Sequence, residues 1–176
     1  ETGVGKSTLI RMLLALVSPD KGCIRFYTDK ETVTASPQTR CNIVYVPQGN
    51  SLMSGTIREN LLLGNPKATE TQMREALHTA AAEFVYDLPE GLDTSCGEQG
   101  SGLSDGQAQR IAIARGLLRP GGVLLLDEPT SSVDSGTETV LLERLATEVG
   151  DKTLILVTHR DKIAELCSSR LHLKRV

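Results

Sequence analysis

The stretch that decides the fold lies at the start of the chain and reads Gly3-Val4-Gly5-Lys6-Ser7-Thr8. It completes the phosphate-loop pattern G-x-x-x-x-G-K-[ST], although the first glycine of that pattern would fall directly before Glu1. The glycines let successive backbone N–H groups turn inward, and a helix that begins at the serine adds the positive end of its dipole. A polyphosphate is the ligand that this shape fits.

The side chains of this loop have separate predicted roles. Lys6 can reach the β- and γ-phosphates as a mobile point charge, and the Ser7 hydroxyl is placed to bind Mg²⁺. The alternative is a glycine-rich turn that holds a lysine by chance. A phosphate loop normally follows a buried strand, so we expect further residues before Glu1 in the natural protein.

Beyond this loop, short apolar runs alternate with segments of helical period, which is typical of a parallel sheet covered by helices. The class is therefore α/β. Strands are expected over 23–27, 43–46, 123–126, 154–157 and, half-exposed, at Leu171 to Leu173. Helices are expected over 7–17, from the Thr69 capping box to about 87, over 108–118, and from a capping box at Ser135 to 149. Segments 28–42 and 92–102 show no regular pattern.

The composition and net charge of the chain argue against some classes of function. The 176 residues suffice for about one domain, and 19 Lys and Arg against 22 Asp and Glu give a net charge of −3. There is thus no basic field that would hold nucleic acid, and no nucleic-acid partner is expected. The longest apolar run, 12–17, is far short of the roughly 20 residues that span a bilayer. The 4 cysteines show no C-x-x-C spacing, and we interpret them as packing residues. His78 and His172 are interpreted as surface or packing residues.

A second chemical signal follows the apolar run 123–126, where Asp127 and Glu128 stand side by side. Parallel sheets place their ligands at the carboxyl ends of strands. Asp127 is suited to hold Mg²⁺, and Glu128 to polarise a water by accepting its proton. Solvated loop acids are the alternative, but an apolar strand before them and a phosphate loop upstream favour a site.

Taken together, the motifs resemble those of ABC transporter ATPase domains, and they occur in the order of that family. They are Gly5-Lys6-Ser7-Thr8, Val46-Pro47-Gln48, Leu103-Ser104-Asp105-Gly106-Gln107, Leu125-Leu126-Asp127-Glu128-Pro129-Thr130 and Thr158-His159-Arg160. The match covers nearly the whole chain.

The resemblance implies a role for each matched residue. Lys6 to Thr8 resemble the end of Walker A, Asp127 resembles the Walker B aspartate, and Glu128 resembles the catalytic glutamate. His159 resembles the switch histidine, and Gln48 the Q-loop glutamine, which shares the metal with Ser7 and Asp127. The implied nucleotide-binding residues are Gly3, Val4, Gly5, Lys6, Ser7, Thr8, Ser104, Gly106, Gln107 and Asp134, the last being the D-loop aspartate.

The family also implies an architecture and partners. The fold would be that of P-loop NTPases, with a core of about 1–47 and 120–176 and a helical subdomain of about 48–119 that carries the signature motif, which Ser104 to Gln107 resemble. ATP and Mg²⁺ would be the ligands. Two such domains would pair head to tail, so that Lys6 of one copy and Ser104 of the other face the same ATP.

Two further segments resemble exporter-type members: 54–61 with Gly64, and 97–100. A membrane domain fused upstream and a position on the cytoplasmic face of the membrane, the inner membrane if bacterial, are what this implies. The alternatives are a soluble ABC ATPase without a membrane partner and a nucleotide-binding module that does not hydrolyse ATP. One departure bears on the chemistry: Asp105 replaces a glycine of the signature, and its charge could repel a γ-phosphate.

Overall fold

The computed structural model describes residues 5–97, 102–160, 163, 165 and 167–173. Its central sheet consists of β3 (Ile43–Val46), β6 (Val123–Asp127) and β7 (Thr153–Val157), in the order β3-β6-β7. All of these strands run parallel, with Val46 opposite Leu126 and Asp127 opposite Val157. The predicted α/β class, with a parallel sheet flanked by helices, is confirmed.

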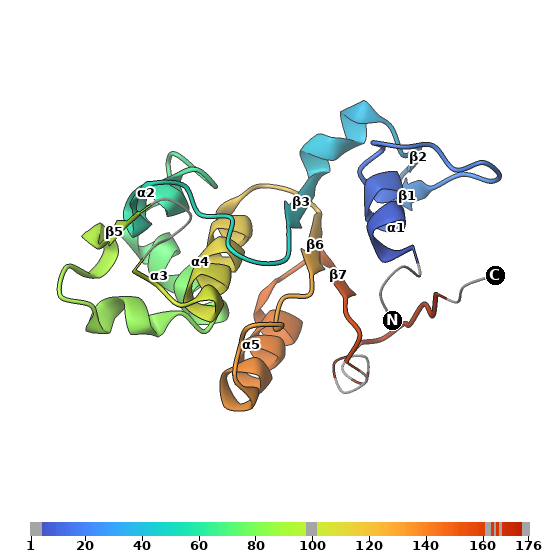
Figure 1. Cartoon of the computed structure of the whole chain (residues 1–176). Helices are drawn as coiled ribbons and strands as arrows, with labels where there is room; N and C mark the ends of the chain where they lie inside the picture. Colours follow the sequence, from blue (N-terminus) through green and yellow to red (C-terminus); the bar gives the residue numbers. More distant parts are fainter. Residues whose placement is uncertain (1–4, 98–101, 161–162, 164, 166, 174–176) are drawn as a thin grey trace.

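Both faces of this sheet are covered, which is why its strands read as continuous apolar runs. Successive residues of a strand point to opposite faces. On one face the sheet packs on α1 (Lys6–Leu13), and the buried residues there are Ile10, Ile43, Val123 and Leu125. On the other face lie α4 (Asp105–Leu118) and α5 (Ser135–Glu148), and Figure 1 shows them across the sheet from α1. The buried residues on that side include Val44, Val46, Leu124, Leu126, Leu141 and Leu145.

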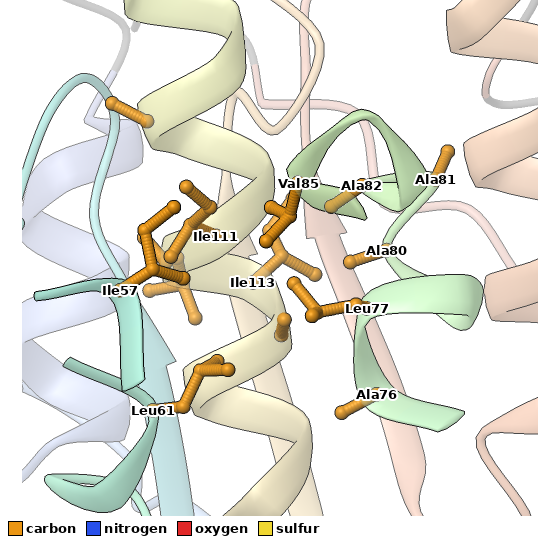
Figure 2. Packing of buried hydrophobic residues seen from close by; sticks show 14 of the residues in the cluster. Ile57, Leu61, Ala76, Leu77, Ala80, Ala81, Ala82, Val85, Ile111 and Ile113 are labelled. Carbon is orange, nitrogen blue, oxygen red and sulfur yellow. The ribbon is translucent and has the colours of Figure 1, made fainter. Parts of the chain in front are cut away.

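The chain between β3 and β6 is mainly helical. It contributes most of the buried apolar residues on the side of the sheet that α4 and α5 cover. It contains α2 (Ile57–Leu62), α3 (Glu70–Thr79) and α4, together with a ribbon of β4 (Gly55–Thr56) and β5 (Ser95–Cys96) and two 3₁₀ turns, η2 (Glu83–Asp87) and η3 (Gly91–Asp93). Figure 2 shows α4 between the other two helices, with Ile111 facing α2 and Ile113 facing Leu77 of α3. Each of these side chains is fully buried.

Two helices end earlier than their apolar period predicts. The helix expected over 7–17 ends at Leu13, because Ala15 adopts φ 49° and the Leu16 N–H bonds back to Arg11 O at 2.8 Å. The helix expected to reach about 87 ends at Thr79 in the same way, with Ala81 at φ 51° and Ala82 N–H on Leu77 O at 2.7 Å. These left-handed caps satisfy the last carbonyls, so the backbone turns although apolar residues continue.

Four local predictions on strands and caps were also wrong. Segment 28–42 holds β2 (Thr32–Thr34), paired antiparallel with β1 (Arg25–Tyr27), and η1 (Pro37–Asn42), while Ser95–Cys96 forms a strand within 92–102. Leu171 to Leu173 form no strand in the described part of the chain, because alternation alone does not supply a partner to pair with. The N-cap of α5 is Asp134, whose carboxylate accepts the Gly136 and Thr137 N–H groups, so Ser135 is already helical.

Within the described residues, none of the helices has the length and apolar character needed to cross a bilayer.

Candidate active site

The candidate active site lies where the strands of the parallel sheet end. Because β3, β6 and β7 run in the same direction, their carboxyl ends share one edge of the sheet. Gln48 follows β3, Glu128 follows β6 and His159 follows β7. The amino end of α1 reaches the same edge, since Lys6 contacts Glu128.

Glu128 is the centre of this cluster. Its Oε1 accepts a hydrogen bond from Lys6 Nζ at 2.5 Å, and the His159 Nδ1 lies 2.9 Å from both carboxylate oxygens. Only 7% of Glu128 is exposed. Burial alone raises the pKa of this carboxyl, but the hydrogen bonds from Lys6 and His159 outweigh it, and the pKa is lowered overall. Glu128 is therefore an ionised, buried carboxylate between two nitrogen groups.

The backbone also holds Glu128 in an uncommon conformation. Its φ is 47°, in the left-handed region that residues other than glycine rarely adopt. The Glu128 N–H donates to Val157 O at 2.8 Å, and the Glu128 carbonyl accepts from the Ser131 N–H at 3.2 Å. The bonds on both sides hold the turn directly after β6. Such conformations cluster at functional sites, where the surrounding structure supports them.

Asp127 has a different environment from its neighbour. Its Oδ2 lies 3.4 Å from the hydroxyl of Tyr45, which donates to it from the adjacent strand β3. Burial raises the pKa of Asp127, and the charge of Glu128 adds to this effect. Sequence reasoning did not single out Tyr45. The available signal was its alternation with Val44 and Val46, which directs it to the sheet face opposite theirs.

The start of α1 has backbone N–H groups that no side chain of the described residues caps. Gly5 precedes the helix with φ 95°, and no side-chain hydrogen bond or acidic residue is found in its first turn among the described residues. In contrast, α2, α3, α4 and α5 begin with a capping side chain from Thr56, Thr69, Ser104 and Asp134 respectively. Ser7 and Thr8 are exposed, whereas the predicted binding residues Gly3 and Val4 lie outside the described residues. The open helix start is suited to an anion.

The remaining predicted residues do not join the Glu128 cluster. Gln48 is exposed, and in the part of the chain that the structure describes it makes no hydrogen bond to Glu128. Ser104 and Gln107 cap α4 reciprocally: the Ser104 hydroxyl accepts from Gln107 N–H at 3.2 Å, and Gln107 Oε1 accepts from Ser104 N–H at 2.9 Å. Asp134 caps α5. These groups lie in separate loops of the same protomer.

Gly106 is in the tightest contact of the signature segment. A Cβ added there would lie 2.3 Å from the Ser132 backbone oxygen, so only glycine allows α4 to approach the loop before α5 this closely. Asp105 is exposed in the first turn of α4, where a negative charge interacts favourably with the helix dipole.

The oxygen groups of the site suit a magnesium ion. The predicted donors are the Ser7 hydroxyl, an Asp127 carboxylate oxygen and the Gln48 amide oxygen, which are hard ligands of the kind that Mg²⁺ prefers. The raised pKa of Asp127 shows a partly desolvated carboxylate, and a cation beside it would offset that cost.

The sequence is similar to those of several known proteins. The profile of the ABC transporter family matches residues 1–131. The chain is 40% identical over 163 residues to an ATP-dependent permease of Candida albicans, with 90% of this chain and 24% of that protein covered. It is 39% identical over 160 residues to a transport ATP-binding protein of Providencia stuartii, with 90% and 27% covered.

A solved structure of a bacterial Atm1-family ABC exporter with ATP bound superposes with a TM-score of 0.79 at 36% identity, covering 92% of this chain and 28% of that one. The chain spans between 20% and 30% of the length of the curated relatives that it matches.

Proposed function

We propose that this chain, which belongs to the ABC transporter family as one of its ATP-binding domains, binds ATP with Mg²⁺ and hydrolyses it to drive export across a membrane. The observation that carries the proposal is the Lys6–Glu128–His159 cluster beside an uncapped helix start. It combines anion-binding groups with a buried carboxylate that can accept a proton.

Binding begins with an exchange of partners by Lys6. The ammonium group now donates to Glu128 at 2.5 Å, and its side chain is 26% exposed, so it can turn toward incoming phosphates. The N–H groups at the start of α1 bind the same phosphates. Mg²⁺, held by Ser7, Asp127 and Gln48, would neutralise charge on the phosphate oxygens.

Hydrolysis depends on the hydrogen bond that Glu128 loses when Lys6 turns toward the phosphates. Without the Lys6 hydrogen bond, the pKa of Glu128 is higher than in the Lys6-bound state, because one of the contacts that lower it is gone, and the carboxylate becomes a stronger proton acceptor for the attacking water. His159 keeps the carboxylate oriented through its Nδ1, 2.9 Å from the carboxylate, and its other ring nitrogen contacts the γ-phosphate. The chain thus activates its base when the phosphates arrive.

The loops that carry Ser104, Gly106, Gln107 and Asp134 complete the site of a second copy. In this proposal two domains pair head to tail, and the capped start of α4 from one faces the ATP bound by the other. The helical part, about 48–119, forms a subdomain beside the core of about 1–47 and 120–176. Tight packing of Gly106 on Ser132 joins the loop that carries Ser104 to the loop that carries Asp134 within one copy.

Coupling to export rests on the surface near Gln48. The exposed Gln48 leads into the segment 54–64, whereas 98–100 of the second exporter-like segment lie outside the described residues. We place this surface against a membrane-spanning partner on the cytoplasmic face. Its support is the exporter that the chain resembles at a TM-score of 0.79.

The test is ATP binding and turnover by the complete protein carrying Lys6→Ala, with Lys21→Ala as the matched control at an exposed lysine. We expect Lys6→Ala to weaken Mg-ATP binding and to abolish turnover, and the control to match wild type. Glu128→Gln should retain binding and lose turnover. Equal turnover in wild type and Glu128→Gln would instead indicate a module that binds nucleotide without using this carboxylate.

A further inference from the structure

An ion pair outside the proposed chemistry joins the residue after His159 to α5. The Arg160 Nη1 donates to Glu138 Oε1 at 2.5 Å. The Glu138 side chain is 16% exposed and that of Arg160 34% exposed, so the pair is partly shielded from water. The Arg160 N–H also bonds the Thr158 hydroxyl at 3.0 Å, which holds the turn after β7.

The pair closes a ring of contacts around the site. Glu138 lies in the first turn of α5, and its N–H donates to Asp134 O at 2.8 Å. The loop from Glu128 to Asp134 is held by bonds from Ser131 N–H to Glu128 O and from Val133 N–H to Thr130 O, both at 3.2 Å. Glu128 in turn bonds His159, which precedes Arg160. The ring therefore runs from His159 through Glu128, α5 and Arg160 back to His159.

The small contribution that the Arg160–Glu138 ion pair makes to stability does not by itself explain the pair. A partly exposed ion pair contributes little to the free energy of unfolding, because solvent screens it and two long side chains lose conformational freedom. The position of the pair beside His159 is more informative. More than half of the His159 side chain is exposed, 56%, so its contacts do not enclose it, and the adjacent Arg160 is the anchor that holds its backbone to α5.

We propose that Arg160 and Glu138 are a positioning pair: they hold the His159 imidazole against Glu128 and link it to the loop that carries Asp134. This inference rests on the proposed hydrolysis of ATP and adds residues to that same site. Neither member of the pair is among the nucleotide-binding residues proposed above. The pair acts through His159, and its loss lowers the rate of hydrolysis without removing any phosphate-binding group.

The experiment compares Glu138→Gln with wild type in the complete protein, and uses Glu143→Gln, an exposed glutamate of the same helix, as the matched control. We expect Glu138→Gln to lower kcat by about tenfold while the KM for ATP and the Kd for Mg-ATP stay within about twofold, since coupling of groups in one network is typically of this size. The control should leave all of these constants unchanged. The exchanged pair Arg160→Glu with Glu138→Arg should recover part of the lost kcat.

A double-mutant cycle with His159→Ala separates positioning from a general loss of structure. If the pair acts through His159, Glu138→Gln causes no further decrease in the His159→Ala background. A further tenfold decrease there, an unchanged kcat in Glu138→Gln alone, or a parallel rise in the Kd for Mg-ATP would each overturn the proposal. Failure of the proposed function is recognised separately, because wild type itself would then neither bind nor turn over ATP.

Discussion

Replacing Gly106 by alanine tests how α4 is joined to the loop before α5. The added Cβ would lie 2.3 Å from the Ser132 backbone oxygen and 3.2 Å from its carbonyl carbon. Ordinary contacts of this kind begin above about 3 Å, so one backbone must retreat by nearly an ångström, and no side-chain rotation can relieve the clash. Overpacking of this kind costs about 1–3 kcal/mol. We expect Gly106→Ala to be destabilising by about 2 kcal/mol.

The assay is thermal unfolding of the complete protein, followed by the signal of its ATP-binding domain. For a domain of this size, about 2 kcal/mol corresponds to a decrease in Tm of about 4–8 °C. Asp105→Ala is the matched control, since the neighbouring side chain is exposed and its removal costs only a weak interaction with the helix dipole, below about 1 kcal/mol. Equal Tm values for Gly106→Ala and wild type would refute the close packing on which the reasoning depends.

Three further predictions concern the site and the core. The pKa of Glu128 is lowered from 4.5 in the folded protein, so its stabilising contribution is present above that value and is lost as pH falls through the folded pKa. The Tm difference between wild type and Glu128→Gln should therefore shrink on acidification. A difference that grows would contradict the Lys6 contact. Tyr45→Phe removes the hydroxyl 3.4 Å from Asp127. Calorimetric titration of Mg²⁺ into the ATP complex should show that the affinity for Mg²⁺ changes by a few-fold at most and that ATP binding is retained. Loss of ATP binding would show that Tyr45 has another role. Leu77→Ala empties a fully buried position in the helical core and should be destabilising by about 2–5 kcal/mol in chemical denaturation; a change below about 1 kcal/mol would mean that α3 is not packed as described.

The sheet and the position of the site could be predicted because their signals are local. The runs 43–46, 123–126 and 154–157 are apolar over their whole length, as strands buried on both faces are, and the structure confirms each within a residue. Polar residues after such strands predict a site at the carboxyl edge. The apolar period did not show where α1 and α3 end, because a left-handed residue at Ala15 or Ala81 depends on the turn that follows.

By itself, the sequence determined the α/β class, the phosphate-binding motif and the family, since these depend on residue types at short spacing. Only the tertiary structure decided which side chains meet. Lys6 reaches Glu128 across 122 positions, and His159 reaches it across 31, because the parallel order β3-β6-β7 brings distant strand ends to one edge. The Tyr45–Asp127 and Arg160–Glu138 contacts and the packing of Gly106 on Ser132 arise in the same way. Contacts between distant segments depend on the order of the strands in the sheet and on how the helices pack across it, and residue types at short spacing do not specify these.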